Sequence, residues 1–396
     1  MMTKTKKSNL NKSKTPIRLI LLWSAIITLA IYPDVMDPIN SVKFWCLLLL
    51  TGMLLGKYYR VIFLGFSKVK IITIPLLLFL IGQIFSILTM PNIYTGIFGD
   101  FQRRLGFITY FCLVIIFLLF TTYYDSTNFN KIIYTLFFTV TVVTLYGFLQ
   151  HFGIDFVKWV NPYNSVISTL GNPNFSGAFI GSSSVLILAI LLFNLNKKIK
   201  MQIILLALLV ISMLTVYFSD ARQGLLIFLF GSLILFSFKS YFISKKLGIC
   251  VSGISLIILF LSLLAMLQIG PLKSLLYKPS ITVRGYYWRA AWRMFVDHPI
   301  NGVGIDNFGN FFKLYRDANY PLSYGYNLTS TNAHNVFLQF FATGGILVGG
   351  SYLFIFILTF YTGFKNILTC DDIEKKIQNV ILFTLWLTFQ TQSLIS

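Results

Sequence analysis

Long apolar runs dominate this chain, and short polar segments separate them. A run of about 18 or more residues without charge is typical of a helix that spans a membrane. The pattern predicts eleven spans, at residues 17–32, 44–56, 71–90, 105–122, 132–152, 175–194, 203–218, 223–238, 247–268, 334–364 and 380–396. We therefore expect a single polytopic all-α membrane domain over residues 1–396, with a long polar loop at residues 270–333 between spans nine and ten.

The last two predicted spans differ from the rest. The tenth is longer than a bilayer core requires and contains two glycine pairs, Gly344 with Gly345 and Gly349 with Gly350. We expect a bent helix whose first turns stand clear of the bilayer. The eleventh span ends with the sequence itself, so we expect either eleven spanning helices or a truncated form of a twelve-helix fold.

The amino-acid composition also indicates a membrane protein. Of the 396 residues, 56% are hydrophobic and 11% are charged, whereas about a quarter are charged in an ordinary soluble domain. A soluble domain of this composition would expose large apolar patches, which lipid accepts without penalty.

The distribution of Lys and Arg predicts how the chain is oriented. With the N-terminus in the cytoplasm, 20 of the 32 Lys and Arg residues fall in cytoplasmic segments, as the positive-inside rule requires. Anionic lipid headgroups then account for most of the net charge of +20, without a nucleic-acid partner. No small-residue cleavage site follows the basic N-terminus, so we expect an uncleaved first span in the inner membrane and a periplasmic loop at residues 270–333.

Several classes of protein are disfavoured by what the sequence lacks. No Asp, Glu, Lys or Arg lies near the middle of a predicted span, which argues against an ion-coupled carrier or pump. The four cysteines show no disulfide framework and no metal-ligand spacing. The sequence also contains no phosphate-binding loop and no dinucleotide-binding fingerprint. Any chemistry should therefore lie where polar residues gather at the outer face.

Two short connections at that face carry candidate residues. In GNPN, Asn172 and Asn174 precede a helix, where an asparagine either caps the helix or donates to an oxygen-rich ligand. In SDARQG, Arg222 interrupts the inside-positive pattern, with Asp220 two residues away. Either these two form a structural ion pair, or the planar guanidinium is held at the membrane edge to bind a phosphate.

The long loop and the start of span ten supply the remaining candidates. VRGYYWRAAWRMF predicts an amphipathic helix in the membrane interface, with Arg284, Arg289 and Arg293 near one face. These arginines either extend to lipid headgroups or form a cationic stripe for a ligand. His334 and Asn335 open the tenth span, where a histidine is either a capping residue or a base for a hydroxyl.

Taken together, these motifs resemble the O-antigen ligase and O-antigen polymerase superfamily of bacterial envelope enzymes. The resemblance covers about residues 105–350 and rests on the order of GNPNFSGAF, SDARQGLL, VRGYYWRAAWRMFVDHPINGVGIDNFGNFF and AHNVFLQFFATGGILVGG. The family commonly has about twelve spans with a cytoplasmic C-terminus, and the last of these has no counterpart in this sequence. A large periplasmic loop between spans nine and ten is a further point of similarity.

The resemblance implies a metal-independent, inverting glycan transfer on the periplasmic face, with no cofactor. The donor would be a glycan on undecaprenyl pyrophosphate, and the acceptor either lipid A-core or a growing glycan. By similarity, Arg222 and Arg284 would bind the pyrophosphate, and His334 would be the catalytic base. Four more residues of the same motifs are candidates for substrate binding: Asn172, Asn174, Arg289 and Asn335.

Other activities fit the same resemblance. Ligase, polymerase and protein-glycosylating relatives share these motifs, and the sequence does not distinguish them. A rival function of another class is a membrane transporter or accessory protein, since some members of the superfamily are linked to inorganic carbon accumulation. The uncharged spans count against that rival, and Arg222 with His334 at one face favours the enzyme.

Overall fold

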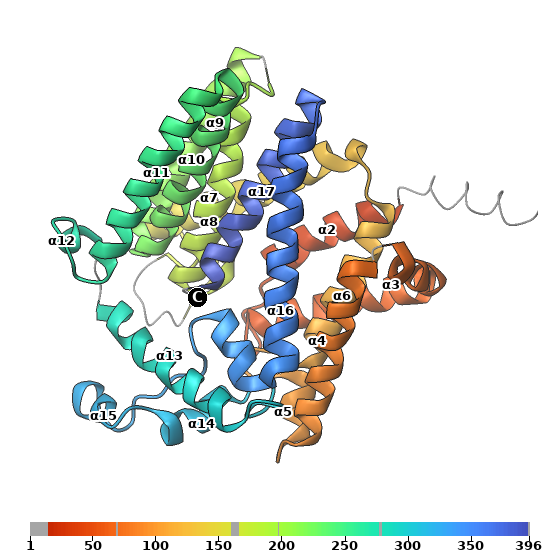
Figure 1. Cartoon of the computed structure of the whole chain (residues 1–396), viewed down its shortest axis with the longest axis vertical. Coiled ribbons are helices and arrows are strands. Elements are labelled where there is room, and N and C mark those ends of the chain that lie inside the picture. Colours follow the sequence, from red (N-terminus) through yellow and green to blue (C-terminus); the bar gives the residue numbers. More distant parts are fainter. Residues whose placement is uncertain (1–14, 69, 160–165, 197, 277–278, 395–396) are drawn as a thin grey trace, which may run out of the picture. The chain divides into compact units, whose positions relative to one another are not determined.

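The computed structural model describes residues 15–68, 70–159, 166–196, 198–276 and 279–394. Every regular element in this part of the chain is a helix, which confirms the predicted all-α class (Figure 1). Some residues used above lie outside the described residues. Six of them are among the 20 Lys and Arg assigned to the cytoplasm, namely Lys4, Lys6, Lys7, Lys12, Lys14 and Lys197, and Ser396 ends the last predicted span.

Each predicted span corresponds to one helix. These helices are α2 (Thr15–Leu29), α3 (Asn40–Lys68), α4 (Lys70–Leu88), α6 (Phe107–Tyr123), α7 (Phe129–His151), α8 (Pro173–Leu192), α9 (Ile199–Phe218), α10 (Arg222–Ile243), α11 (Lys245–Met266), α16 (Val336–Thr369) and α17 (Ile373–Ser393). Within the described ranges, eight helices are long and apolar enough to cross a membrane, and α2 and α6 are apolar but shorter. The chain is therefore a multi-pass membrane protein, while the count of eleven spans stays a prediction.

Two predicted boundaries are wrong. The second span was expected at residues 44–56 with a connection after it, but α3 continues to Lys68. No proline interrupts residues 57–68, so nothing in the sequence ends the helix there. The last helix begins at Ile373, seven residues before the predicted 380, and Lys375 lies in its first turn. Basic residues that were assigned to loops thus belong to the ends of helices.

The described residues form two compact units. One consists of residues 1–139, 294–308 and 340–358, and the other of residues 140–293, 309–339 and 359–396. In the second unit, α8 packs against α9, α10 and α17, and α10 also packs against α11. Figure 1 shows α10 and α11 side by side. All the residues predicted as site residues belong to this second unit.

In the first unit, α3 and α4 pack against α6, and a buried carboxylate fixes a loop. Asp306 accepts hydrogen bonds from the backbone N–H of Asp100 at 2.8 Å and of Leu105 at 3.3 Å. Its other oxygen lies 3.4 Å from Nε of Arg103. One carboxylate thus satisfies two backbone donors and a cation in the turn that follows α5 (Ile93–Phe98).

The bend that the glycine pairs predicted in the tenth span is confirmed. Gly345 has φ +64° inside α16, a conformation that only glycine adopts easily. A Cβ atom at this position would lie 2.2 Å from the carbonyl oxygen of Ile300, so the close approach of that loop also requires glycine. Where α16 lies relative to a bilayer stays a prediction.

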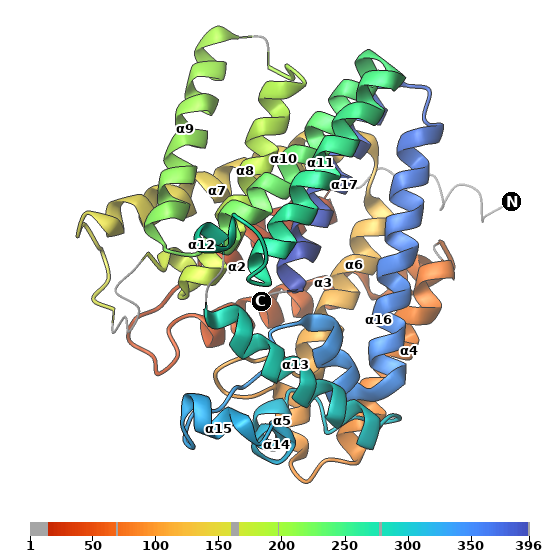
Figure 2. The ribbon, with the colours of Figure 1, turned by 60° about the vertical axis from the view of Figure 1, so that its left-hand side comes forward.

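The polar segment at residues 270–333 is largely helical. It contains α12 (Lys273–Leu276), α13 (Pro279–Asp297), α14 (Phe308–Tyr315) and α15 (Asn319–Tyr324). The helix predicted from the aromatic and arginine spacing is confirmed as α13, while its position in the membrane interface stays a prediction. Figure 2 shows α13, α14 and α15 close together. Aromatic rings join them: the ring centroids of Tyr287 and Phe312 are 5.4 Å apart, and those of Phe312 and Tyr320 are 5.2 Å apart.

Candidate functional site

Glycines bring the N-terminal half of α8 against the first turn of α10. A Cβ atom on Gly181 would lie 2.3 Å from the carbonyl oxygen of Gly224, and one on Gly224 would lie 2.3 Å from that of Gly177. Side chains do not tolerate such distances, so this approach depends on glycine. Gly177 and Gly181 are four residues apart, the spacing of small residues that lets two membrane helices pack backbone to backbone. The N-terminal ends of α8 and α10 are held side by side as a result.

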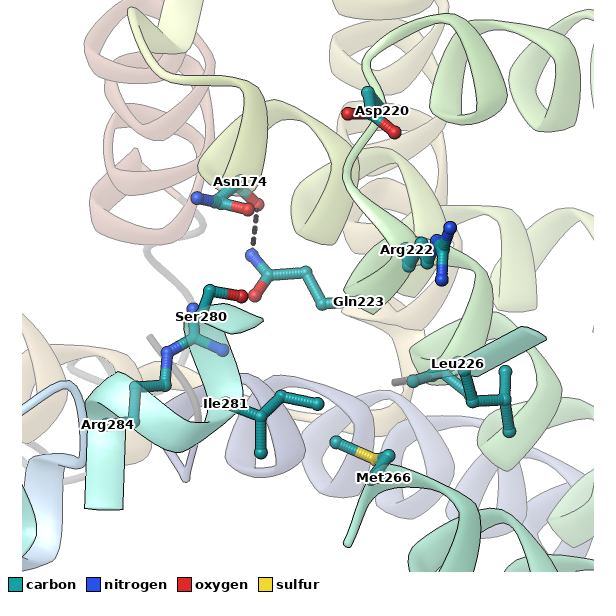
Figure 3. A pocket seen from close by; sticks show the side chains of 10 residues that line it. Asn174, Asp220, Arg222, Gln223, Leu226, Met266, Ser280, Ile281 and Arg284 are labelled. Atoms are coloured by element: carbon teal, nitrogen blue, oxygen red, sulfur yellow. Dashed lines mark hydrogen bonds between the residues drawn. The ribbon is translucent and has the colours of Figure 1, made fainter. Parts of the chain in front are cut away.

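A small polar pocket lies beside this contact (Figure 3). Its volume is about 80 Å³, enough for several water molecules or one small polar group, since a single water occupies roughly 10–15 Å³ by the same measure. Its walls come from α8, α10, α11, α12, α13 and the turn before α10. The lining residues are Asn174, Asp220, Arg222, Gln223, Leu226, Met266, Leu276, Ser280, Ile281 and Arg284.

Two guanidinium groups give this pocket its positive charge. Arg222 and Arg284 are 62 positions apart in the sequence, and both line the pocket. Burial lowers the pKa of Arg284, but a guanidinium keeps its proton far above neutral pH. Asp220 also lines the pocket. It lies in the turn before α10 and has φ +53°. The two arginines that the resemblance implies as phosphate ligands therefore line the same pocket.

Three helix N-termini contribute to the pocket as well. Asn174 is the second residue of α8, Arg222 the first of α10 and Ser280 the second of α13. The first turn of a helix has backbone N–H groups without helical partners and carries the positive end of the helix dipole. Both features favour an anion. The dipoles of the three helices thus add to the positive charge of the arginines, although at α8 the N–H of Asn174 already donates to Asn172.

Gln223 is a pocket residue that the sequence analysis did not identify. Its side chain is only 7% exposed, and its Nε2 donates to the backbone oxygen of Asn174 at 2.8 Å. Among the described residues, none donates a hydrogen bond to Gln223 Oε1. Figure 3 shows this amide reaching toward Ser280 and Arg284. The pocket therefore holds a fixed acceptor among its cations.

His334, which lies just before α16, contacts α13, the helix that carries Arg284. Its ring stacks on Tyr287, with centroids 5.4 Å apart and planes inclined by 27°. Tyr287 follows Arg284 by three residues on α13, so one helical turn separates them. His334 has φ +50°, and strain of this kind costs of order 1–3 kcal/mol per residue. The histidine is thus held in an unusual backbone conformation just before α16.

Two predicted substrate ligands are helix caps. The side chain of Asn172 accepts from the N–H of Asn174 at 2.8 Å and caps α8. The side chain of Asn335 accepts from the N–H of Leu338 at 3.1 Å and caps α16. The capping interpretation of Asn172 is confirmed, whereas at α16 the cap is Asn335 and not His334, for which capping was the alternative. Neither Asn172 nor Asn335 lines the pocket. Both side-chain oxygens are therefore engaged in holding the helices that position the site.

Arg289 has contacts that differ from those of Arg284. Its guanidinium lies 4.4 Å from the centroid of the Tyr286 ring, and its Nε lies 3.6 Å from an oxygen of Asp317. Arg293 lies 3.7 Å from the same carboxylate. These two arginines join α13 to the segment before α15, and neither lines the pocket. The structure does not bring Arg289 to Arg222.

Sequence reasoning missed three residues of this region: Gln223, Ser280 and Tyr287. Gln223 directly follows Arg222 in SDARQG, and Tyr287 lies between the arginines of the loop motif, so both were adjacent to identified residues. Nothing in the sequence distinguishes Ser280. Among the residues that the structure describes, no group of His, Cys, Asp and Glu could hold a metal ion.

Comparison with known proteins bears on these motifs directly. Residues 207–353 match the model of a family described as O-antigen ligase. The matched segment contains Arg222, Arg284 and His334 and three of the four motifs, while GNPNFSGAF lies before it. No curated protein matches the chain.

Proposed function

We propose that this chain, a member of the O-antigen ligase and polymerase superfamily, transfers a glycan from undecaprenyl pyrophosphate to an acceptor hydroxyl at the periplasmic face. The observation that carries the proposal is the pocket that contains both Arg222 and Arg284 at three helix N-termini. Such a pocket suits an anion of the size of a phosphate group, with the bulky lipid and glycan outside it.

The arginines would act on the leaving group. As the bond between the anomeric carbon and the phosphate oxygen breaks, negative charge grows on the pyrophosphate. Two guanidiniums and three helix ends next to it would stabilise that charge more in the transition state than in the bound substrate. Since these groups already offset the charge, the proposal needs no metal ion and no cofactor.

His334 would act on the acceptor. A neutral imidazole takes the proton of the acceptor hydroxyl while the hydroxyl oxygen forms its bond to the anomeric carbon. The electron pair of the broken bond leaves with the pyrophosphate. Attack from the face opposite the leaving group inverts the anomeric carbon. The stack with Tyr287 supports this role, because a base must be held in one orientation.

The charge distribution supports the proposed side of the membrane. A cytoplasmic N-terminus places 20 of the 32 Lys and Arg residues in the cytoplasm. The same orientation assigns residues 270–333 and the turn with Arg222 to the periplasm of the inner membrane. Lipid-linked glycan and its acceptor would then meet at the outer headgroup level.

The test is genetic complementation. In a strain from which the gene is deleted, Arg222→Ala, Arg284→Ala or His334→Ala should fail to restore the surface polysaccharide ladder on a gel. Arg293→Ala, on the same helix as Arg284 but outside the pocket, is the matched control and should restore it. Full ladders from all three variants at normal protein level would refute the site. Bare lipid A-core in the deletion strain would indicate a ligase, and a single attached repeat unit a polymerase.

A further inference from the structure

The side chain of Gln223 is a hydrogen-bond acceptor in a pocket otherwise built for an anion. The residue is 7% exposed, and its Oε1 has no hydrogen-bond donor among the residues that the structure describes. A buried acceptor without a partner is uncommon, because its lost hydration is not repaid. Its presence at a pocket wall indicates a partner that arrives with the ligand.

The amide cannot easily turn to present its other end. Gln223 Nε2 donates to the backbone oxygen of Asn174 at 2.8 Å, and a flipped amide would place two oxygens against each other there. Asn174 itself is fixed by the Asn172 cap on its N–H. The orientation of the amide therefore follows from the first turn of α8, and Oε1 is left toward the pocket.

An ionised phosphate cannot satisfy this acceptor. Phosphate oxygens accept hydrogen bonds, and they match the guanidiniums of Arg222 and Arg284 and the helix N–H groups instead. Gln223 Oε1 needs an O–H or N–H group that enters beside the phosphate. In a glycosyl pyrophosphate, the nearest such group is the substituent on the carbon next to the anomeric carbon, a hydroxyl or the N–H of an acetamido group.

We propose that Gln223 recognises the first sugar of the donor by accepting a hydrogen bond from the hydroxyl or acetamido group at its C2. This inference rests on the proposed function and adds the substrate class: donors whose first sugar carries a hydrogen-bond donor at C2. Arg222 and Arg284 bind the phosphate, and Gln223 distinguishes one sugar from another. Gln223 acts here as a specificity-determining residue.

The protein should discriminate strongly against a donor without a hydrogen-bonding group at C2, because such a donor leaves Gln223 Oε1 without a partner. A donor lipid with a 2-deoxy first sugar would displace water from Oε1 and leave the oxygen buried without a partner. Sites built to bind a polar group reject analogues that lack it for this reason. We expect the wild-type protein to favour the intact donor by about 10- to 100-fold in kcat/KM, a range typical of one buried hydrogen bond.

The experiment compares two donors on two proteins. Purified wild-type protein and Gln223→Met receive polyprenyl pyrophosphate carrying a first sugar with a 2-acetamido group or its 2-deoxy analogue, and product formation gives kcat/KM for each. Methionine keeps the length of the side chain and removes the acceptor. We expect the preference of wild type for the intact donor, taken as the ratio of the two kcat/KM values, to fall to near unity in the variant.

The outcomes separate the possible failures. If Gln223 only supports Asn174, both donors slow by the same factor and the preference persists, which overturns the inference. Equal rates for both donors with the wild type overturn it as well, even if the variant does not fold. If the wild type transfers neither donor, the proposed function itself fails.

Discussion

The phenol ring of Tyr287 stacks on the imidazole of His334, with 5.4 Å between the ring centroids. Tyr287 is three residues after Arg284 on the same helix, and Arg284 lines the pocket that also contains Arg222. A single turn of α13 thus connects the electropositive pocket to the only histidine among the predicted site residues. One short helix thus contacts His334 through Tyr287 and carries Arg284 into the pocket.

Tyr287 should act through its ring and not through its hydroxyl. Burial and the neighbouring Tyr320 raise the pKa of the Tyr287 phenol, so this group stays protonated at neutral pH and is unsuited to be a base. Tyr287→Phe keeps the stack and should retain kcat to within about threefold. Tyr287→Leu fills similar space without a flat ring, and we expect kcat to fall about 10- to 100-fold as His334 loses its orientation. Steady-state rates on purified protein test this, and a slow Phe variant with an active Leu variant would refute it.

Arg284→Lys should make the activity fall as the pH becomes alkaline. Burial disfavours the charged form and lowers the pKa of Arg284. The ordinary pKa of a guanidinium is so high that Arg284 stays charged in spite of this. A lysine starts near 10.4, and the same burial would bring its pKa down toward the assay range. Since the cation is lost as pH rises through that pKa, kcat/KM of the variant should fall between about pH 7 and 10, beyond any fall in the wild type. Arg293→Lys, which is outside the pocket, should follow the wild type. Superimposable profiles for Arg284→Lys and wild type would contradict this.

Close packing of α8 on α10 should be intolerant of a single methyl group. The Cβ atom of Gly181→Ala would lie 2.3 Å from the carbonyl oxygen of Gly224, so the helices must separate. We expect a loss of about 1–3 kcal/mol in the free energy of unfolding, together with lower activity because Gln223 and Asn174 move apart. Gly253→Ala is the matched control, because a Cβ atom there meets nothing within 4 Å. Thermal unfolding in detergent measures both variants, and equal melting temperatures would show that the packing is not as tight as described.

The buried carboxylate of Asp306 should contribute strongly to stability. Its removal leaves the N–H groups of Asp100 and Leu105 without their acceptor and Arg103 without its carboxylate. Asp306→Ala should cost about 3–5 kcal/mol, as is usual when one partner of a buried charged group is deleted. Asp306→Asn keeps one oxygen and tolerates the φ of +54°, so its cost should be smaller. The exposed Asp371→Ala provides the baseline, and a loss of similar size there would refute a specific role for Asp306.

Much of the fold followed from the sequence because lipid imposes simple rules. Apolar runs predicted a helix at every span, and the glycine pairs predicted the bend at Gly345. Helix limits were predicted less well, since charge counts treat Lys57 and Arg60 in the same way whether they lie in a loop or in the last turns of α3. No breaker marks that boundary, so composition alone could not find it.

The site was predicted in part for a related reason. Arg222, Arg284 and His334 stood out because they interrupt an otherwise apolar or inside-positive pattern. Gln223 did not, because its importance depends on Asn174, which is 49 residues earlier and meets it only through the packing of α8 on α10. The spacing of Gly177 and Gly181 was the available signal for that contact. Asn172 and Asn335, in contrast, were predicted as substrate ligands but cap helices. An asparagine before a helix has the same sequence signature in both roles.

The most direct test of glycan transfer is reconstitution with defined substrates. Purified protein in lipid nanodiscs would receive glycan-linked undecaprenyl pyrophosphate with either lipid A-core or a free glycan acceptor, and released undecaprenyl pyrophosphate and elongated acceptor would be measured together. We predict that the two products appear in equal amounts with one of the acceptors, and that Arg222→Ala and Arg284→Ala each lower turnover by about 100-fold or more. Absence of both products with wild-type protein, or unchanged turnover in the arginine variants, would contradict the account.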